Sequence, residues 1–120
     1  MVGGVTQFDL LSYTDVVAAR QQAREMAREM GFGLTDQTRI ATAVSEVAHQ
    51  TLTQQGRARL RLTTLLTTTR RGVECTCLSV EWLRDSNGNA LEGVGRLMDE
   101  FTLEPRSGRE VAVVMRKWLH

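Results

Sequence analysis

The spacing of apolar residues changes at Gly56, and this change restricts the folds open to the chain. From Thr14 to Gly56, apolar side chains recur at the spacing of one face of a helix. From Arg57 onward they alternate with polar side chains, as in a strand with one buried face. The chain therefore combines early helices with strands that follow them.

The first predicted helix covers about residues 15–30. Thr14 or Asp15 is its expected N-cap, and Gly31 stands where a helix commonly ends on glycine. The positively charged side chains of this segment fall mostly off its apolar side. The expected apolar side holds Val16, Val17, Ala23, Met26, Ala27 and Met30.

The second predicted helix covers about residues 36–54 and closes near Gly56. Thr35 is its expected cap, and Asp36 places a negative charge in the first turn, where the helix dipole favours it. The predicted apolar stripe of this helix consists of Ile40, Val44, Val47, Ala48 and Leu52.

The remaining segments are mostly strands. "FDLLS" (8–12) predicts a short strand, and residues 57–69 and 73–83 predict a hairpin turned at Gly72. "ALEGVGRLMDEF" (90–101) has helical spacing. Residues 102–118 predict strand, turn and strand, with the turn from Pro105 to Gly108.

The predicted order is β-α-α-β-β-α-β-β. Because helices come early and sequence neighbours pair as strands, we expect an α+β fold. In this two-layer α/β sandwich, the helices cover one face of a mainly antiparallel mixed sheet. A length of 120 residues suits a single domain, 1–120.

The composition narrows the function classes. The net charge of +1 gives no global attraction to nucleic acid or to an anionic membrane. No apolar run approaches the roughly 20 residues that span a bilayer. The first residues lack the pattern of a signal peptide, so a cytoplasmic location is expected.

The cysteines and arginines favour structural roles. Cys75 and Cys77 are expected to be small buried residues on one side of a strand, since a zinc site needs four ligands and the only histidines are His49 and His120. A basic edge is predicted on the hairpin. A solvated strand is its simplest interpretation, and an acidic protein partner or nucleic acid are the alternatives. The arginines of this edge are Arg57, Arg59, Arg61, Arg70 and Arg71.

Three polar groups share one side of the second helix. Glu46, His49 and Gln50 are spaced i, i+3 and i+4, which places a carboxylate, an imidazole and a carboxamide close together. One interpretation is structural: these residues lie on a solvated helix face or fill a former pocket, and none of them takes part in catalysis. Catalysis by Glu46 is the alternative.

Two blocks of the sequence point to a known family. They are "DVVAARQQAREMAREMGFGLTDQTRIATAVSEVAHQ" and "LEGVGRLMDEF" followed by a strand ending in "RKW". Both resemble the bacterial RsbT-type switch kinases, which are anti-sigma-factor serine kinases of the GHKL (Bergerat-fold, histidine-kinase-like ATPase) superfamily. The resemblance extends from about Asp15 to Trp118. It implies the two-layer α/β sandwich of that superfamily.

The resemblance gives the polar stripe a candidate role. "SEVAHQ" stands in place of the family's N box, usually Ser-Glu-Leu-Ala-Arg-Asn. Glu46 matches the glutamate that helps orient or deprotonate the attacking hydroxyl. Gln50 stands where an asparagine coordinates magnesium, and His49 where arginine is usual. The extra methylene of Gln50 shifts its oxygen by roughly 1–1.5 Å, which disturbs a magnesium site of near-ideal geometry.

The family's next motif is missing. Its second hairpin strand is followed by Asp-x-Gly-x-Gly, whose aspartate binds adenine, and then by a mobile lid and a glycine-rich phosphate turn. This sequence has no Asp-x-Gly-x-Gly, and the segment is too short for a lid. Gly88 keeps one glycine of the phosphate turn, and Ala90 replaces the next. Glu81 or Asp85 is a possible relic of the adenine-binding aspartate.

The metal ligand, the adenine anchor and the phosphate loop therefore all depart from the family. The resemblance implies a degenerate member that binds protein partners without ATP or any other cofactor, in a bacterial partner-switching pathway. Glu46, Gln50, Gly88 and Ala90 are then vestigial positions. An active ATP-dependent serine/threonine kinase that phosphorylates a STAS-domain antagonist is the alternative, with Glu46 as the base, Gln50 as metal ligand and Mg-ATP as cofactor.

The partners that the resemblance implies are a STAS-domain antagonist, a PP2C-type phosphatase, a sigma factor or a stressosome-like assembly. No contact with nucleic acid or membrane is expected, and a homodimer or a role as scaffold subunit stays open. The candidate partner contacts are Arg20, Arg24, Trp82 and Asp85.

Overall fold

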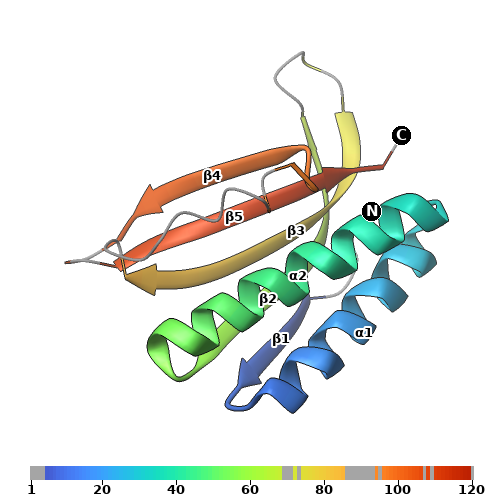
Figure 1. Ribbon diagram of the computed structural model, residues 1–120. Helices are drawn as coiled ribbons and strands as arrows, with labels where there is room; N and C mark the ends of the chain where they lie inside the picture. The colour runs from blue at the N-terminus through green and yellow to red at the C-terminus, as the bar shows by residue number, and fades with distance from the viewer. Residues whose placement is uncertain are drawn as a thin grey trace.

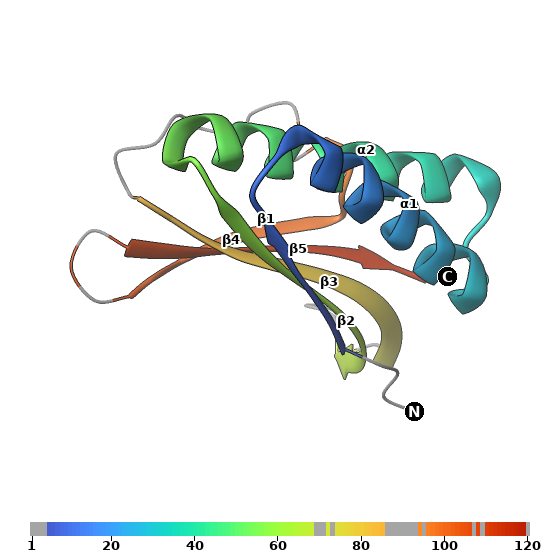
Figure 2. The same ribbon diagram turned by 90° about the horizontal axis from the view of Figure 1, so that it is seen from below.

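Two helices cover one face of a five-stranded sheet in the computed structural model (Figures 1 and 2). It describes residues 5–68, 72, 74–85, 94, 96–106, 108 and 110–119. The helices are α1 (Tyr13–Met30) and α2 (Leu34–Gln55). The strands are β1 (Val5–Leu10), β2 (Ala58–Thr68), β3 (Glu74–Asp85), β4 (Glu100–Pro105) and β5 (Glu110–Trp118).

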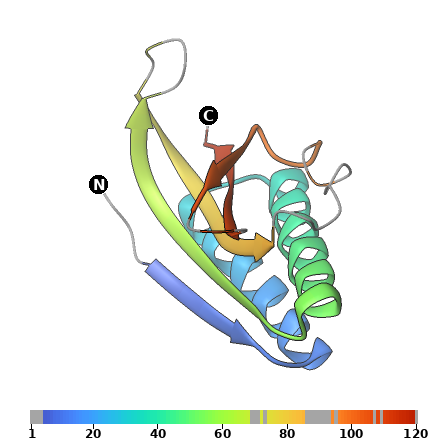
Figure 3. The ribbon, with the colours of Figure 1, turned by 90° about the vertical axis from the view of Figure 1, so that its left-hand side faces the viewer.

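The sheet has the strand order β1-β2-β3-β5-β4, and each of these pairings is antiparallel. This confirms the α+β class and the two-layer arrangement. The prediction of a mixed sheet is wrong for these strands. Figure 3 shows β1 at the edge of the sheet beside β2.

The start of α1 differs from the prediction by two or three residues. Its N-cap is Ser12, because the Asp15 carboxylate reaches back and accepts hydrogen bonds from the backbone N–H groups of Leu11 at 2.9 Å and Ser12 at 3.2 Å. These bonds, that of Leu11 first, lower the pKa of Asp15. The predicted end is confirmed, since Gly31 has the left-handed φ of 99° that glycine tolerates.

The start of α2 also precedes the prediction. Gly33 is the N-cap in place of Thr35, since the backbone N–H of Gln37 already donates to the Gly33 carbonyl at 2.9 Å. The Gln37 side chain is buried and donates to the Phe32 carbonyl at 2.8 Å, which fixes the turn between the helices. Gly56 ends α2 with a φ of 77°, as predicted.

The two helices pack through small side chains. Ala19, Ala23 and Ala27 of α1 are fully buried. Val17, which the helical spacing placed with them, is exposed instead, because the face that contacts α2 and the sheet is narrower than the apolar stripe. All five predicted apolar residues of α2 are buried.

The predicted helix over 90–101 is wrong where it can be compared. Val94 and residues 96–99 form turns and bends, and Glu100 and Phe101 belong to β4. Pairing with β5 decides this, since Asp99 N–H donates to the Arg116 carbonyl at 3.0 Å and Phe101 lies opposite Met115. Residues 90–93 and 95 lie outside the described residues. Within the described part of the chain, neither helix is both long and apolar enough to cross a membrane.

Candidate functional site

The polar stripe of α2 lies where the sequence predicted. Burial of the opposite side of α2 against the sheet leaves Thr42, Glu46 and His49 exposed. Gln50 is half-buried, at the boundary between the exposed and the packed sides. Glu46 and Gln50 therefore lie one turn apart, as the N-box spacing requires.

His49 is directed toward α1. Its ring centroid lies 4.9 Å from that of Tyr13, at an interplanar angle of 38°. The Tyr13 hydroxyl also lies 3.0 Å from Thr53 Oγ1, one turn further along α2. These contacts join the start of α1 to the last turns of α2.

The described residues contain no cluster of metal ligands. Among the residues that the structure describes, no three histidine, cysteine, aspartate or glutamate side chains are placed to hold a metal ion. Cys77 is buried, as predicted for a small apolar residue. His120 lies outside the described residues.

The end of β3 departs from the prediction. Trp82 was predicted to be a half-buried core or rim residue that fills the former nucleotide pocket or contacts a partner, and it is 1% exposed in the core beneath the helices. It lies between Leu60 and Val113 in the sheet register. A partner cannot reach Trp82 in this conformation, so the prediction of a partner contact at Trp82 is wrong. Among the residues that the structure describes, its indole N–H finds no acceptor.

Glu81 precedes Trp82 and therefore points to the opposite face of the sheet, away from the helices. It pairs in register with Arg61 and Val114. A carboxylate on that face cannot bind an adenine beside α2. Glu81 therefore does not take the place of the family's adenine-binding aspartate. The β3 backbone stays paired with β5 as far as Asp85, opposite Glu110. Gly88 and Ala90 lie outside the described residues.

The basic positions separate into paired and unpaired groups. Arg59 Nε lies 2.6 Å from Asp9 Oδ1 of β1, in an exposed ion pair. Arg57 and Arg61 are also exposed, as are Arg20 and Arg24 on α1, and none of these four takes part in an ion pair within the described ranges. Arg70 and Arg71 lie outside those ranges.

Comparison with known proteins assigns the family. No protein-family model matches the chain. The serine/threonine-protein kinase RsbT of Bacillus subtilis (strain 168) is 32% identical over 124 aligned positions, which cover 92% of this chain and 93% of that protein. The chain belongs to the RsbT family. A chain in the crystal structure of the SiaB–SiaC complex from Pseudomonas aeruginosa has the same fold, with a TM-score of 0.54 at 10% identity, over 95% of this chain and 89% of that chain.

The structure adds one cluster to this RsbT-family chain that the sequence analysis missed. Lys117, the only lysine of the chain, is 7% exposed. Its Nζ lies 3.2 Å from Asp99 Oδ1 and 3.6 Å from Asp36 Oδ1. Asp99 also accepts from the Trp118 backbone N–H at 2.8 Å. The cluster therefore ties the end of β5 to the first turn of α2 and to the start of β4.

A signal for this cluster was present in the sequence. Val111, Val113, Met115 and Lys117 alternate along β5, so the lysine continues the side that packs under the helices. A lysine at such a position is almost never buried unless it is paired. In this RsbT-family fold, Lys117 acts as a connector between elements.

Proposed function

We propose that this RsbT-family protein is a non-catalytic regulator in a bacterial partner-switching pathway, and that it acts by binding a protein partner without ATP. Membership of the family supports the pathway. A STAS-domain antagonist is the first expected partner, and a PP2C-type phosphatase or a sigma factor are the others. The proposed loss of catalysis rests on the residues that stand where a nucleotide would need its ligands.

The placement of side chains along β3 carries the proposal. An adenine anchor needs a carboxylate on the helix side of the sheet, followed by glycines that let the backbone approach phosphates. At this point the helix-side residue is the buried Trp82, and the neighbouring carboxylate of Glu81 lies on the other face. The strand then continues in regular pairing to Asp85 without the glycine motif.

The residues on α2 fit Mg-ATP poorly. Glu46 is exposed and keeps the position of the family's glutamate. Gln50 is half-buried, and its carbonyl oxygen is one methylene further from the helix than that of the asparagine expected there. Magnesium demands octahedral oxygen ligands at about 2.0–2.1 Å, so the longer side chain would have to fold back to reach the ion.

The outward side of α1 is the proposed partner surface. Tyr13, Val17, Arg20 and Arg24 are spaced i, i+4, i+7 and i+11, so they share one side of the helix, and all four are exposed. The stripe is apolar at its start and basic further along. Neither arginine is neutralised by a described acidic group. Such a surface is complementary to a partner that presents carboxylates beside an apolar patch.

An active protein kinase is the second candidate. Its support is the 32% identity to RsbT over nearly the whole chain, together with the exposed carboxylate of Glu46. In this case Glu46 would accept the proton of the partner's hydroxyl group, and Gln50 would have to bind the metal.

A phosphotransfer assay separates the two candidates. The purified chain is incubated with Mg-ATP and a STAS-domain protein from the same cell, and the intact mass of the STAS protein is measured. We expect no added phosphoryl group. Phosphorylation that is lost in Glu46→Ala, with folding of the variant confirmed by circular dichroism, would establish the kinase instead.

A binding measurement tests the α1 surface. We expect Arg20→Glu and Arg24→Glu each to weaken binding to the STAS-domain protein by about tenfold or more, mainly through faster dissociation. Arg61→Glu is the matched control, since it makes the same charge change at an exposed position on the sheet. Equal effects of all three variants would mean that only net charge matters and that α1 is not the contact.

A further inference from the structure

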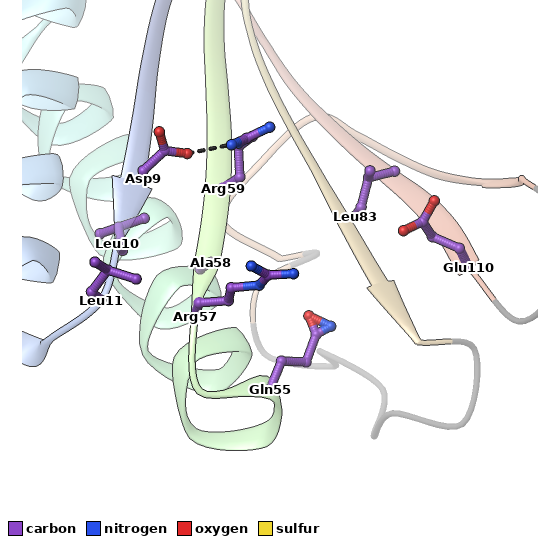
Figure 4. A pocket seen from close by; sticks show the side chains of 9 residues that line it. All are labelled: Asp9, Leu10, Leu11, Gln55, Arg57, Ala58, Arg59, Leu83 and Glu110. Atoms are coloured by element: carbon purple, nitrogen blue, oxygen red, sulfur yellow. Dashed lines mark hydrogen bonds and ion pairs between the residues drawn. The ribbon is translucent and has the colours of Figure 1, made fainter.

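A hollow of about 600 Å³ lies where several elements end, and it belongs to no site described above (Figure 4). Leu11 borders it after β1, Gln55 at the end of α2, and Arg57 before β2. Leu83 near the end of β3 and Glu110 at the start of β5 complete the residues that matter for binding. Its volume falls within the range of roughly 300–1,000 Å³ seen for ligand sites.

Two leucines expose apolar surface at this hollow. Leu11 is 72% exposed and Leu83 is 42% exposed. They come from separate elements, yet both line the same space. Single exposed leucines are ordinary, whereas two that converge on one concave site provide an apolar floor for a ligand.

The charges of the hollow are only partly neutralised. Arg59 forms the exposed ion pair with Asp9 described above, so its charge is partly neutralised. Arg57 is exposed and has no ion-pair partner in the described part of the chain. Figure 4 shows the Arg57 and Gln55 side chains extending toward the strand ends that carry Leu83 and Glu110.

The combination matches a peptide better than a simple anion. Arg57 offers a guanidinium to a carboxylate, and the two leucines offer apolar contact beside it. Gln55 carries both a donor and an acceptor, as a peptide bond requires. Glu110 would repel a free multivalent anion but can face a peptide N–H.

We propose that this hollow binds a short extended segment of a partner protein in which an acidic residue stands beside leucine-like side chains. The acidic side chain pairs with Arg57, and the aliphatic ones contact Leu11 and Leu83. The site uses neither the α1 stripe nor Glu46, so it goes beyond the proposed function. It gives the chain a second contact, at the end of the sheet.

The test uses a blocked pentapeptide, acetyl-Gly-Leu-Glu-Leu-Gly-amide, and protein with ¹³C-labelled leucine methyl groups. We expect saturable shifts of the Leu11 and Leu83 methyl signals, while those of the fully buried Leu60 and Leu62 stay in place. Replacing Glu by Gln in the peptide should weaken binding by about fivefold or more, because the charge-assisted bond to Arg57 is lost. Absence of saturable shifts at Leu11 and Leu83 would overturn the proposal.

Matched variants locate the site. Arg57→Glu should weaken peptide binding by about tenfold, and Arg61→Glu should leave it unchanged, because Arg61 lies in the adjoining strand β2 but outside the hollow. Arg20→Glu should also leave it unchanged, so a failure here leaves the α1 surface standing. Equal losses in Arg57→Glu and Arg61→Glu would contradict the proposal.

Two further measurements distinguish the peptide from other ligands of the hollow. Inorganic phosphate at the peptide concentration should not produce the same methyl shifts. If it does, the hollow is an anion site and the peptide proposal is wrong. Shifts of the same signals on concentrating the protein alone would show that a second copy of the chain occupies the site, which would also overturn the proposal.

Discussion

The two ends of α2 are held in different ways. At the first turn, the buried Lys117 side chain pairs with the partly exposed carboxylates of Asp36 and Asp99. At the last turns, Tyr13 contacts His49 and Thr53 near the surface, and Arg57 just beyond the helix forms no ion pair with a described residue. The paired charges at the first turn stabilise the fold, whereas Arg57, which has no described ion-pair partner, is available to bind another protein.

Removing Lys117 should have the largest effect. Lys117→Met removes the buried cation that pairs with both carboxylates, while Arg39 remains 3.6 Å from Asp36, and we expect a loss of about 3 kcal/mol in the free energy of unfolding. This is at the low end for a broken buried pair, because both carboxylates are partly exposed. Urea denaturation monitored by circular dichroism measures it.

Arg57→Met is the matched control at the other end of α2. It should change stability by no more than about 0.5 kcal/mol, since Arg57 is exposed and makes no described ion pair. Equal losses in the two variants would remove the distinction between the two ends.

Gly33 and Gly56 lie at the two ends of α2, and their replacement should change stability by smaller amounts. Gly56→Ala should cost about 1–2 kcal/mol, because its φ of 77° is unfavourable for any side chain. Gly33→Ala should stay within about 0.5 kcal/mol, since the φ of Gly33 is −69° and an added Cβ meets no atom within 4 Å. Thermal unfolding of both variants tests this. A larger loss for Gly33→Ala would show that the cap at the helix start is the more demanding one.

The Tyr13 contact should contribute less still. Tyr13→Phe removes the hydrogen bond to Thr53 and keeps the ring beside His49, so we expect a loss of about 0.5 kcal/mol. Combined with Thr53→Val in a double-mutant cycle, the coupling energy should be of the same size. A coupling energy of zero would mean that the hydroxyl bonds water in preference to Thr53.

The smallest effect concerns the charge that caps α1. Backbone hydrogen bonds lower the pKa of Asp15 below its ordinary value of 3.8, so the folded state favours the ionised form. The resulting stabilisation is present above that value and is lost as the pH falls through the lowered pKa. The melting temperature of Asp15→Ala should therefore lie below that of the wild type at pH 6, and the gap should narrow at strongly acidic pH. A difference in melting temperature that does not change with pH would contradict the assignment of this stabilisation to the ionised Asp15 carboxylate.

The sequence predicted best where spacing along one element decides the structure. The apolar stripe of α2 and the glycine ends at Gly31 and Gly56 needed no knowledge of tertiary contacts. Residues 96–101 were mispredicted as part of a helix because their apolar spacing suits a helix, while pairing with β5 makes Glu100 and Phe101 part of a strand.

The candidate site divides in the same way. The common side of Glu46, His49 and Gln50 follows from helix geometry alone. The contact of His49 with Tyr13, the burial of Trp82 and the ion pairs of Lys117 each depend on which elements pack together. The burial of Lys117 was not predicted, although strand alternation along β5 carries a signal for it. Its partners Asp36 and Asp99 lie far from it in sequence and are identified only by the fold.

Thermal unfolding with and without millimolar Mg-ATP tests the central claim most directly. A ligand at 100 times its Kd stabilises the native state by about 2.7 kcal/mol, which a melting curve resolves for a domain of this size. The account predicts no upward shift, in the wild type or in Glu46→Ala. A clear upward shift in the wild type that disappears in Glu46→Ala would show that the α2 stripe still binds the nucleotide, and would contradict the account.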